Sequence, residues 1–178
     1  MADVDAALLA ALLRDSLSKG QQPRLTINSN SMTPLLRQGD EIIIESVTLE
    51  QLEPGDILTL TTDSYLLTHR YWGQEQQEGN TYLITRGDQP LVFDPLWPTA
   101  ALMGRVLARQ RQRKVLALDA GWGKWLNGRL TILAMAEAHY LALSPGQPAP
   151  ILTVYQRIQH RLRWYGAKLL TYLIDIIS

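Results

Sequence analysis

Apolar and polar positions follow three successive patterns along the chain, and each pattern predicts a different kind of element. Over residues 3–18, leucines recur every three or four positions, which is the period of an amphipathic helix. Between residues 24 and 120, apolar residues form short runs or alternate with polar ones, which predicts strands. After residue 120 the helical period returns. The sequence therefore predicts a β region with helices on both sides of it.

Turn-forming residues divide the central region into short strands. Gly20 and Pro23 end the first helix, and the segments RQGD, EPGD, QEGN and RGDQP separate the runs that follow. Asp40 and Asp56 each follow a glycine, and we interpret them as turn formers whose side chains bond nearby backbone. Short strands at this spacing favour a coiled, mainly-β sheet over alternating βαβ units. The predicted strands are RLTIN, DEIIIESV, DILTLTT, YLLTHRYW, TYLITR, ALMGRVLAR and KVLALD.

The expected organisation has three parts. They are an N-terminal helix over residues 1–20, a β domain over residues 21–120 and a helical extension over residues 121–178. Within the extension, a helix from about Trp125 is followed by a rigid proline-rich linker at 145–150 and by a last helix from Val154.

The last predicted helix carries a continuous apolar stripe. Its members are Val154, Ile158, Leu162, Tyr165, Leu169, Leu173 and Ile176. We favour packing of this stripe on the body of the protein or on a partner. The alternative is peripheral contact with a membrane, because basic residues outnumber the one acidic residue, Asp175, along the helix. The basic residues are Arg157, Arg161, Arg163 and Lys168.

Composition narrows the classes of function. The 178 residues carry a formal net charge of zero, so no global field favours nucleic acid as a partner. The chain has no cysteine, which excludes disulfides, a thiol nucleophile and cysteine-based metal sites, and which fits a reducing compartment. A basic segment, RVLARQRQRK over residues 105–114, contains five basic residues and no acidic residue. We interpret it as a solvated hairpin or strand edge.

Targeting signals are not expected in this sequence. The N-terminal apolar stretch Ala6–Leu13 is short and follows Asp3 and Asp5, whereas a secretory signal has basic residues there. No segment offers the roughly 20 uncharged apolar residues of a spanning helix. The predicted location is therefore the cytoplasm, with peripheral membrane contact through the last helix as the open alternative.

The segment NSNSMTPLLRQGDEIII, residues 28–44, contains the candidate chemistry. Ser31 is either a loop serine or a nucleophile, and a nucleophilic serine needs a base within hydrogen-bond reach. Two of the three histidines, His139 and His160, fall in predicted helices. His69 falls on a predicted strand in the same β region as Ser31, so it is the candidate base.

Four segments in order carry a family resemblance. SNSMTPLLRQGDEIIIE, LEPGDILTL, LLTHRYW and YLITRGDQP resemble the successive sequence boxes of the signal peptidase I superfamily of serine peptidases, which also includes the self-cleaving SOS-repressor domains. The resemblance covers about residues 24–110. It implies a coiled β peptidase domain and a serine endopeptidase that cleaves a protein or peptide precursor through an acyl-enzyme. It implies no metal and no organic cofactor.

The resemblance also implies roles for single residues. Ser31 matches the nucleophile. His69 matches the general base, in the position where most bacterial members carry lysine. A histidine followed by arginine at this position resembles the endoplasmic-reticulum, archaeal and sporulation branch. Asp88 matches the acidic residue that orients the histidine, and Asp94 is the alternative. The backbone N–H of Ser31 and the hydroxyl of Ser29 match the oxyanion hole.

Departures from the family pattern leave other functions open. Asn30 replaces a usual glycine, and because asparagine tolerates positive φ we expect the tight turn to persist. The usual N-terminal membrane anchor is not expected. A non-catalytic relative that binds a peptide or partner, and a self-cleaving protease, are the alternatives to cleavage in trans. Self-cleavage ranks lower, because no helix-turn-helix and no Ala-Gly pair precede Ser31. The oligomeric state stays open.

Overall fold

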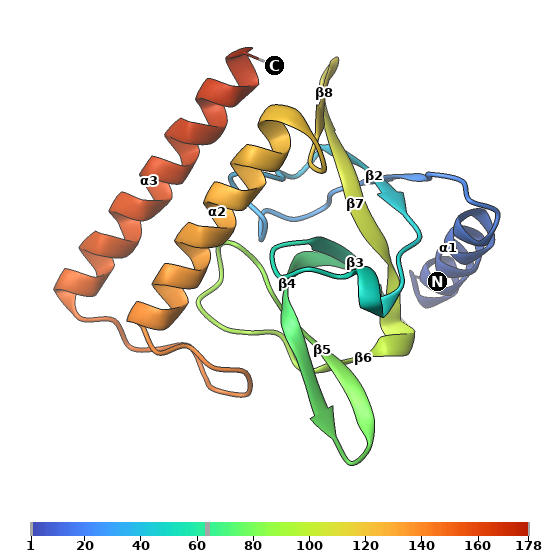
Figure 1. The fold of residues 1–178 in the computed structure, drawn as a ribbon, viewed down its shortest axis with the longest axis horizontal. Helices are drawn as coiled ribbons and strands as arrows, with labels where there is room; N and C mark the ends of the chain where they lie inside the picture. The colour runs from blue at the N-terminus through green and yellow to red at the C-terminus, as the bar shows by residue number, and fades with distance from the viewer. Residues whose placement is uncertain (1, 63–64, 178) are drawn as a thin grey trace.

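The computed structural model describes residues 2–62 and 65–177, and its centre is an eight-stranded antiparallel sheet (Figure 1). The strand order is β1-β2-β7-β3-β4-β5-β6, and β8 pairs with β7. The sheet curls into a half-barrel. The strands are β1 Arg24–Thr26, β2 Glu41–Glu45, β3 Ile57–Thr61, β4 Leu66–Gln77, β5 Asn80–Arg86, β6 Trp97–Pro98, β7 Leu102–Arg111 and β8 Lys114–Ala117.

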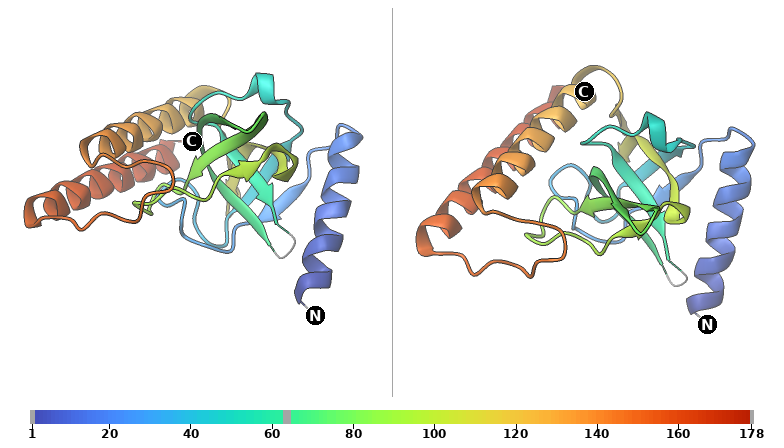
Figure 2. Two further views of the ribbon diagram at one scale, coloured as in Figure 1. Left: turned by 90° about the horizontal axis from the view of Figure 1, so that it is seen from below. Right: turned by 60° about the horizontal axis from the view of Figure 1, so that its bottom comes forward.

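Helices lie on two sides of this sheet. The helix α1 (Ala2–Ser18) lies on one side, whereas α2 (Gly121–Tyr140) and α3 (Val154–Ile177) lie next to each other on the other side (Figures 1 and 2). Two short 3₁₀ helices complete the chain, η1 at Leu49–Gln51 and η2 at Thr99–Ala101. The arrangement places the curled sheet between the N-terminal helix and the C-terminal pair.

The largest apolar core joins the sheet to the C-terminal helices. Ile42 and Ile44 of β2 are fully buried in it, together with Leu126 of α2 and, at the edge, Ile174 of α3. A second core, around Leu58, forms between the other strands and the 3₁₀ helices. Burying this much aliphatic surface in one continuous cluster makes α2 and α3 part of the same packed unit as the first half of the sheet.

The coarse fold prediction is confirmed: the protein has a β-rich domain with helices at its N- and C-terminal ends. Each of the seven predicted strands is present. The structure adds β6, which has only two residues and no alternating pattern to detect, and it extends β4 through Gln77. The second helix begins at Gly121, four residues before the predicted start.

The turn interpretation of the two aspartates is also confirmed. The Asp40 carboxylate accepts a 2.8 Å hydrogen bond from the backbone N–H of Arg37, and the Asp56 carboxylate accepts one of 3.0 Å from that of Glu53. Each side chain therefore closes a three-residue loop ahead of a strand, as such turns require.

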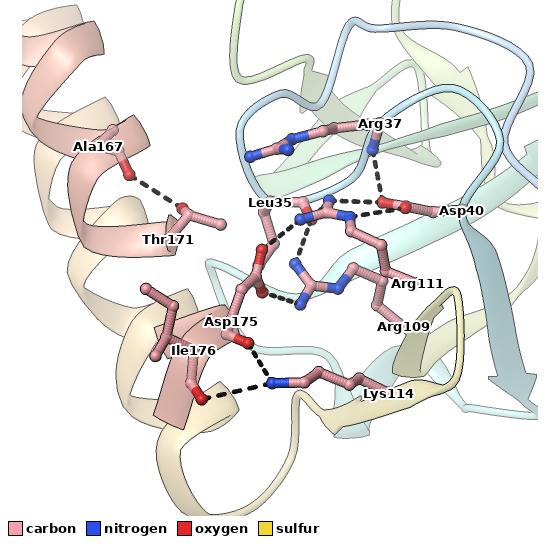
Figure 3. Close-up of polar contacts among 10 residues, drawn as sticks. All are labelled: Leu35, Arg37, Asp40, Arg109, Arg111, Lys114, Ala167, Thr171, Asp175 and Ile176. Carbon is pink, nitrogen blue, oxygen red and sulfur yellow. Dashed lines mark hydrogen bonds and ion pairs between the residues drawn. The ribbon is translucent and has the colours of Figure 1, made fainter. Parts of the chain in front are cut away.

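The interpretation of the basic run as solvated is wrong for its central residues. Arg109 of β7 is only 2% exposed, and with Arg111 it converges on Asp175 at the end of α3 (Figure 3). Arg111 also makes a 2.7 Å ion pair with Asp40. Burial lowers the pKa of the Arg109 guanidinium, and the neighbouring charge of Arg111 lowers it further, whereas Asp175 opposes the shift. The run therefore anchors the C-terminal helix instead of repelling sheets.

The apolar stripe of α3 does not pack on the body of the protein, so that half of the favoured interpretation is wrong, while packing on a partner stays a prediction. The helix buries Ala167, Thr171 and Ile174 on its inner face, whereas Leu162, in the stripe, is 61% exposed. No helix within residues 2–62 and 65–177 combines the length and the apolar character that crossing a bilayer requires.

Candidate active site

The loop that carries Ser31 is held rigidly by its own apolar residues. Met32, Leu35 and Leu36 are almost fully buried in the main core, which fixes the chain directly after the serine. The backbone N–H of Thr33 donates to the Asn30 carbonyl at 3.1 Å, and the peptide bond between Thr33 and Pro34 is cis. Ser31 itself is half-buried. The sequence Ser-Met-x-Pro-Leu-Leu thus presents one hydroxyl from a loop anchored in the core.

The structure brings His69 to Ser31. His69 lies on β4 opposite Leu58 of β3, and its side chain is buried. Its Nε2 atom lies 2.9 Å from the Ser31 hydroxyl oxygen, which is within hydrogen-bond range. A neutral imidazole with the proton on Nδ1 can accept the serine proton at Nε2. The predicted nucleophile and base are therefore in contact, although 38 residues separate them in the chain.

Asp94, and not Asp88, contacts the other nitrogen of this imidazole. The Asp94 carboxylate lies 2.6 Å from His69 Nδ1. The same carboxylate oxygen accepts a 2.6 Å hydrogen bond from the hydroxyl of Thr85, and the Asp94 backbone N–H donates to the Thr85 carbonyl at 3.0 Å. Because Thr85 is fully buried in β5, these two bonds fix the carboxylate against the ring.

Asp88 forms a different, structural contact. Its two carboxylate oxygens accept hydrogen bonds of 2.7 Å from Nε and Nη2 of Arg70, a bidentate pair. Arg70 is fully buried and also donates to the Gly55 carbonyl and to the Thr131 hydroxyl of α2. The contact with His69 that was expected of Asp88 is therefore made by the alternative, Asp94, while Asp88 pairs with Arg70, which connects β4 to α2.

Arg86 is a further charged residue beside the site, and no role for it was predicted from the sequence. Its guanidinium lies 4.7 Å from the ring centroid of Trp72 and 5.7 Å from that of Phe93, the residue before Asp94. Burial lowers its pKa, and the nearby carboxylate of Glu137 opposes that shift. Stacking on Phe93 holds the loop that carries Asp94. Thr85 and Arg86 directly precede Gly87 and Asp88. Both therefore belong to the segment YLITRGDQP, which is the sequence feature that could have drawn attention to them.

The surroundings of Ser31 supply groups that could stabilise an oxyanion. The hydroxyl of Ser29 lies 3.2 Å from that of Ser31. Within the part of the chain that the structure describes, the backbone N–H of Ser31 donates no hydrogen bond, so it is available as a donor. The tight turn at Asn30 persists as expected, with the Thr33 N–H bonded to the Asn30 carbonyl, although Asn30 takes no positive φ. Its side-chain carbonyl instead accepts a 3.1 Å hydrogen bond from the Gln38 N–H and so closes the loop.

An apolar groove of about 610 Å³ begins at Ser31. One wall is the segment 24–29, which includes β1, and the other is the segment 65–68, which leads to His69. Leu9 of α1 also borders it. β1 is the edge of the sheet, and the pairing of β4 with β5 begins only at Arg70, so both walls present an unpaired strand edge. A groove with two such edges fits an extended peptide.

Replacing Gly87 with alanine should displace Ser31 relative to His69, and chemistry that depends on their contact should slow by about a hundredfold. A Cβ atom at position 87 would lie 2.9 Å from the Ser31 carbonyl oxygen, 3.0 Å from His69 Nε2 and 2.8 Å from Pro90 Cδ. All three distances are too short for a carbon atom, so a neighbour must move. Steady-state kinetics measure the effect, and Gly128→Ala, at a position with open space around it, is the control. Equal activity in the two variants would contradict the prediction.

The two remaining histidines lie away from this site. His160 of α3 bonds Glu137 of α2 at 2.7 Å, and His139 lies in the last turn of α2. Within residues 2–62 and 65–177, no three His, Asp or Glu side chains gather as the ligands of a metal would. Neither a protein-family model nor a curated protein matches this chain. The geometry of Ser31, His69 and Asp94 is therefore the observation on which a function can be argued.

Proposed function

We propose that this protein is a serine endopeptidase that cleaves a protein or peptide precursor through an acyl-enzyme. The single observation that carries the proposal is the chain of two contacts from Ser31 through His69 to Asp94, at 2.9 Å and 2.6 Å. A nucleophile, a base and a carboxylate that orients the base are the three parts of a serine hydrolase site. The resemblance of four ordered segments to the signal peptidase I superfamily supports the same assignment, and membership of that superfamily is part of the proposal.

Each residue of the site has a defined task in this reaction. His69 Nε2 takes the proton of the Ser31 hydroxyl as its oxygen attacks the scissile carbonyl, and the C–N bond breaks when His69 returns that proton to the leaving amine. A water molecule, deprotonated by the same nitrogen, then attacks the ester carbonyl; the bond to the Ser31 oxygen breaks, and His69 returns the proton to that oxygen. Asp94 keeps the other ring proton on Nδ1 and stabilises the imidazolium. The Ser31 N–H and the Ser29 hydroxyl stabilise the negative charge on the carbonyl oxygen.

The groove supports a peptide as the substrate. An extended segment placed between the unpaired edges of β1 and β4 can form main-chain hydrogen bonds to both, with its scissile carbonyl at Ser31. Leu25, Met32 and Leu66 line the groove, so a small or aliphatic side chain of the substrate fits beside the cut better than a charged one. Alanine near the cut, as in the signal peptidases, meets this requirement.

The principal alternative is a non-catalytic relative that only binds peptides. Such a protein has no need for a serine hydroxyl in hydrogen-bond contact with an oriented imidazole. It would also not need Thr85 to hold the carboxylate, since that contact serves only the position of Asp94. The contacts at the site therefore favour catalysis, and an acylating or phosphonylating reagent separates the two functions.

A fluorophosphonate probe should label Ser31 and no other serine. The serine oxygen displaces fluoride from phosphorus when His69 removes its proton, so labelling reports activation directly. Peptide mass mapping of the labelled protein identifies the residue. Ser31→Ala and His69→Ala should each lose the label, whereas Ser46→Ala, at an exposed serine in the loop after β2, should keep it. An unlabelled wild-type protein would favour the non-catalytic relative.

A further inference from the structure

The C-terminal helix presents an unpartnered apolar face to the outside of the protein. Six residues, spaced alternately by four and three positions, are each between 52% and 61% exposed. These residues, which we call the outer stripe, are Ile158, Leu162, Tyr165, Leu169, Tyr172 and Ile176. A surface helix normally turns such a stripe toward the core. Contiguous apolar surface of this extent marks an interaction site.

The helix cannot turn its outer stripe inward without breaking its own anchor. The opposite face is already packed: Ala167 and Thr171 are buried, and the Thr171 hydroxyl donates to the Ala167 carbonyl within the helix. At the C-terminal end, Asp175 is paired with both Arg109 and Arg111 (Figure 3). Breaking a partly buried pair of this kind would leave a buried, uncompensated arginine. The outward direction of the stripe is therefore fixed by the fold.

One edge of the outer stripe is basic. On a helix with 3.6 residues per turn, Arg157, Arg161 and Lys168 lie along the same side of the stripe. Arg157 and Arg161 are exposed, and Lys168 lies 3.7 Å from the ring centroid of Trp164. No ion pair joins these three to a carboxylate in the described residues, and the one acid of the helix, Asp175, is occupied by β7. The edge therefore has a net positive charge.

We propose that the outer stripe binds the surface of a bilayer that contains anionic lipids, with α3 lying in the plane of the interface. The helix of 24 residues is roughly 36 Å long, its apolar side chains would enter the acyl region, and the basic edge would meet the lipid phosphates. Tyr165 and Tyr172 have an apolar ring and a polar hydroxyl, which suits them to this boundary.

Charge argues against an antiparallel pair of copies as the occupant. In an antiparallel two-fold pair of α3 helices, the basic edge of one copy lies beside the basic edge of the other, which is unfavourable. Anionic lipid headgroups complement that edge instead. The helix α1, whose Leu9 borders the groove, lies across the sheet from α3 (Figure 2).

Flotation of the full chain with vesicles tests the proposal. The protein should float with vesicles of phosphatidylcholine and phosphatidylglycerol, and binding should weaken with salt and on phosphatidylcholine alone. Leu162→Glu and Leu169→Glu should each weaken binding by on the order of tenfold or more, because each removes a leucine from the acyl region. Arg161→Ala should weaken it by about fivefold on the anionic vesicles and should change nothing on neutral ones.

Leu12→Glu is the matched control. Leu12 is on α1 and is 57% exposed, close to the value of Leu162, so the variant introduces the same charge on the opposite side of the protein. It should float like wild type, and circular dichroism should show that all variants are folded. No flotation of the wild type would overturn the proposal. The proposal would also be overturned if the wild type forms a dimer in analytical ultracentrifugation and Leu162→Glu dissociates it, because a second copy would then occupy the outer stripe. These readouts do not depend on peptidase activity.

Discussion

Ser31→Ala is expected to abolish precursor cleavage, with kcat/KM at least about 10⁴-fold below that of the wild type. The alanine lacks the oxygen that lies 2.9 Å from His69 Nε2, so no acyl-enzyme can form. The Ser31 side chain bonds only Ser29 and His69 among the described residues, so the free energy of unfolding should change by less than about 1 kcal/mol. Mass spectrometry of candidate precursors incubated with each protein measures the first effect, and thermal unfolding measures the second.

Ser46→Ala is the control for this prediction. Ser46 is an exposed serine in a loop. Its replacement by alanine removes the same hydroxyl group away from the site, so this variant should cleave like wild type. Precursor processing that survives in Ser31→Ala at the wild-type rate would disprove the nucleophile. Loss of cleavage together with a large loss of stability would show that Ser31 supports the fold, and the proposed function would then lose its main support.

The pair of Ser31 and His69 could be predicted from the sequence because few residues compete for each role. The chain has three histidines, and only His69 lies in a segment with the period of a strand. The position of His69 beside the Ser31 loop depends on the order of the strands in the sheet. In that order β4 pairs with β3, and the start of β4 is not paired with β5. That order depends on long-range pairing, which the local pattern does not contain.

The two aspartates could not be distinguished by sequence, and the geometry of a strand explains the outcome. His69 and Arg70 are consecutive on β4, so their side chains point to opposite faces of the sheet. Asp88 reaches the face of Arg70, whereas Asp94 reaches the face of His69. Both acids follow β5 within eight residues, and only the path of the loop decides which face each one meets. Thr85 and Arg86 determine that path through contacts that no local pattern reveals.

The helical pattern predicted that α3 is amphipathic but not where its apolar side lies. The same stripe would arise for a helix packed on a core and for a helix that contacts a surface outside the protein. The decisive residues are on the inner face, where Ala167 and Thr171 allow close packing, and on β7, where Arg109 is buried against Asp175. A basic strand that looked solvated is thus what turns the apolar stripe outward.

Asp94→Asn is expected to lower kcat by about 10⁴-fold while the fold remains intact. An asparagine in this place can direct its amide N–H at His69 Nδ1, which then becomes an acceptor and leaves the proton on Nε2. With the proton on Nε2, His69 cannot take the proton of Ser31. Because the same amide nitrogen has a second N–H, which the Thr85 hydroxyl oxygen can accept, the loop should keep its position. Single-turnover cleavage measures the loss, and fluorophosphonate labelling should slow in parallel.

Asp88→Asn, with the same chemical change six residues earlier, should have the opposite profile. Asp88 neutralises Arg70, which is fully buried, so the substitution should cost about 3–5 kcal/mol of the free energy of unfolding. At a temperature where the variant is folded, its kcat should stay within about tenfold of wild type, because the contacts of His69 remain. If Asp88→Asn instead loses activity at full stability while Asp94→Asn cleaves normally, then Asp88 orients the base in the working enzyme. Both substitutions remove one negative charge near the same imidazole, so a general electrostatic effect would reduce the activity of both variants. A difference in activity between the two variants therefore reports a specific contact with His69.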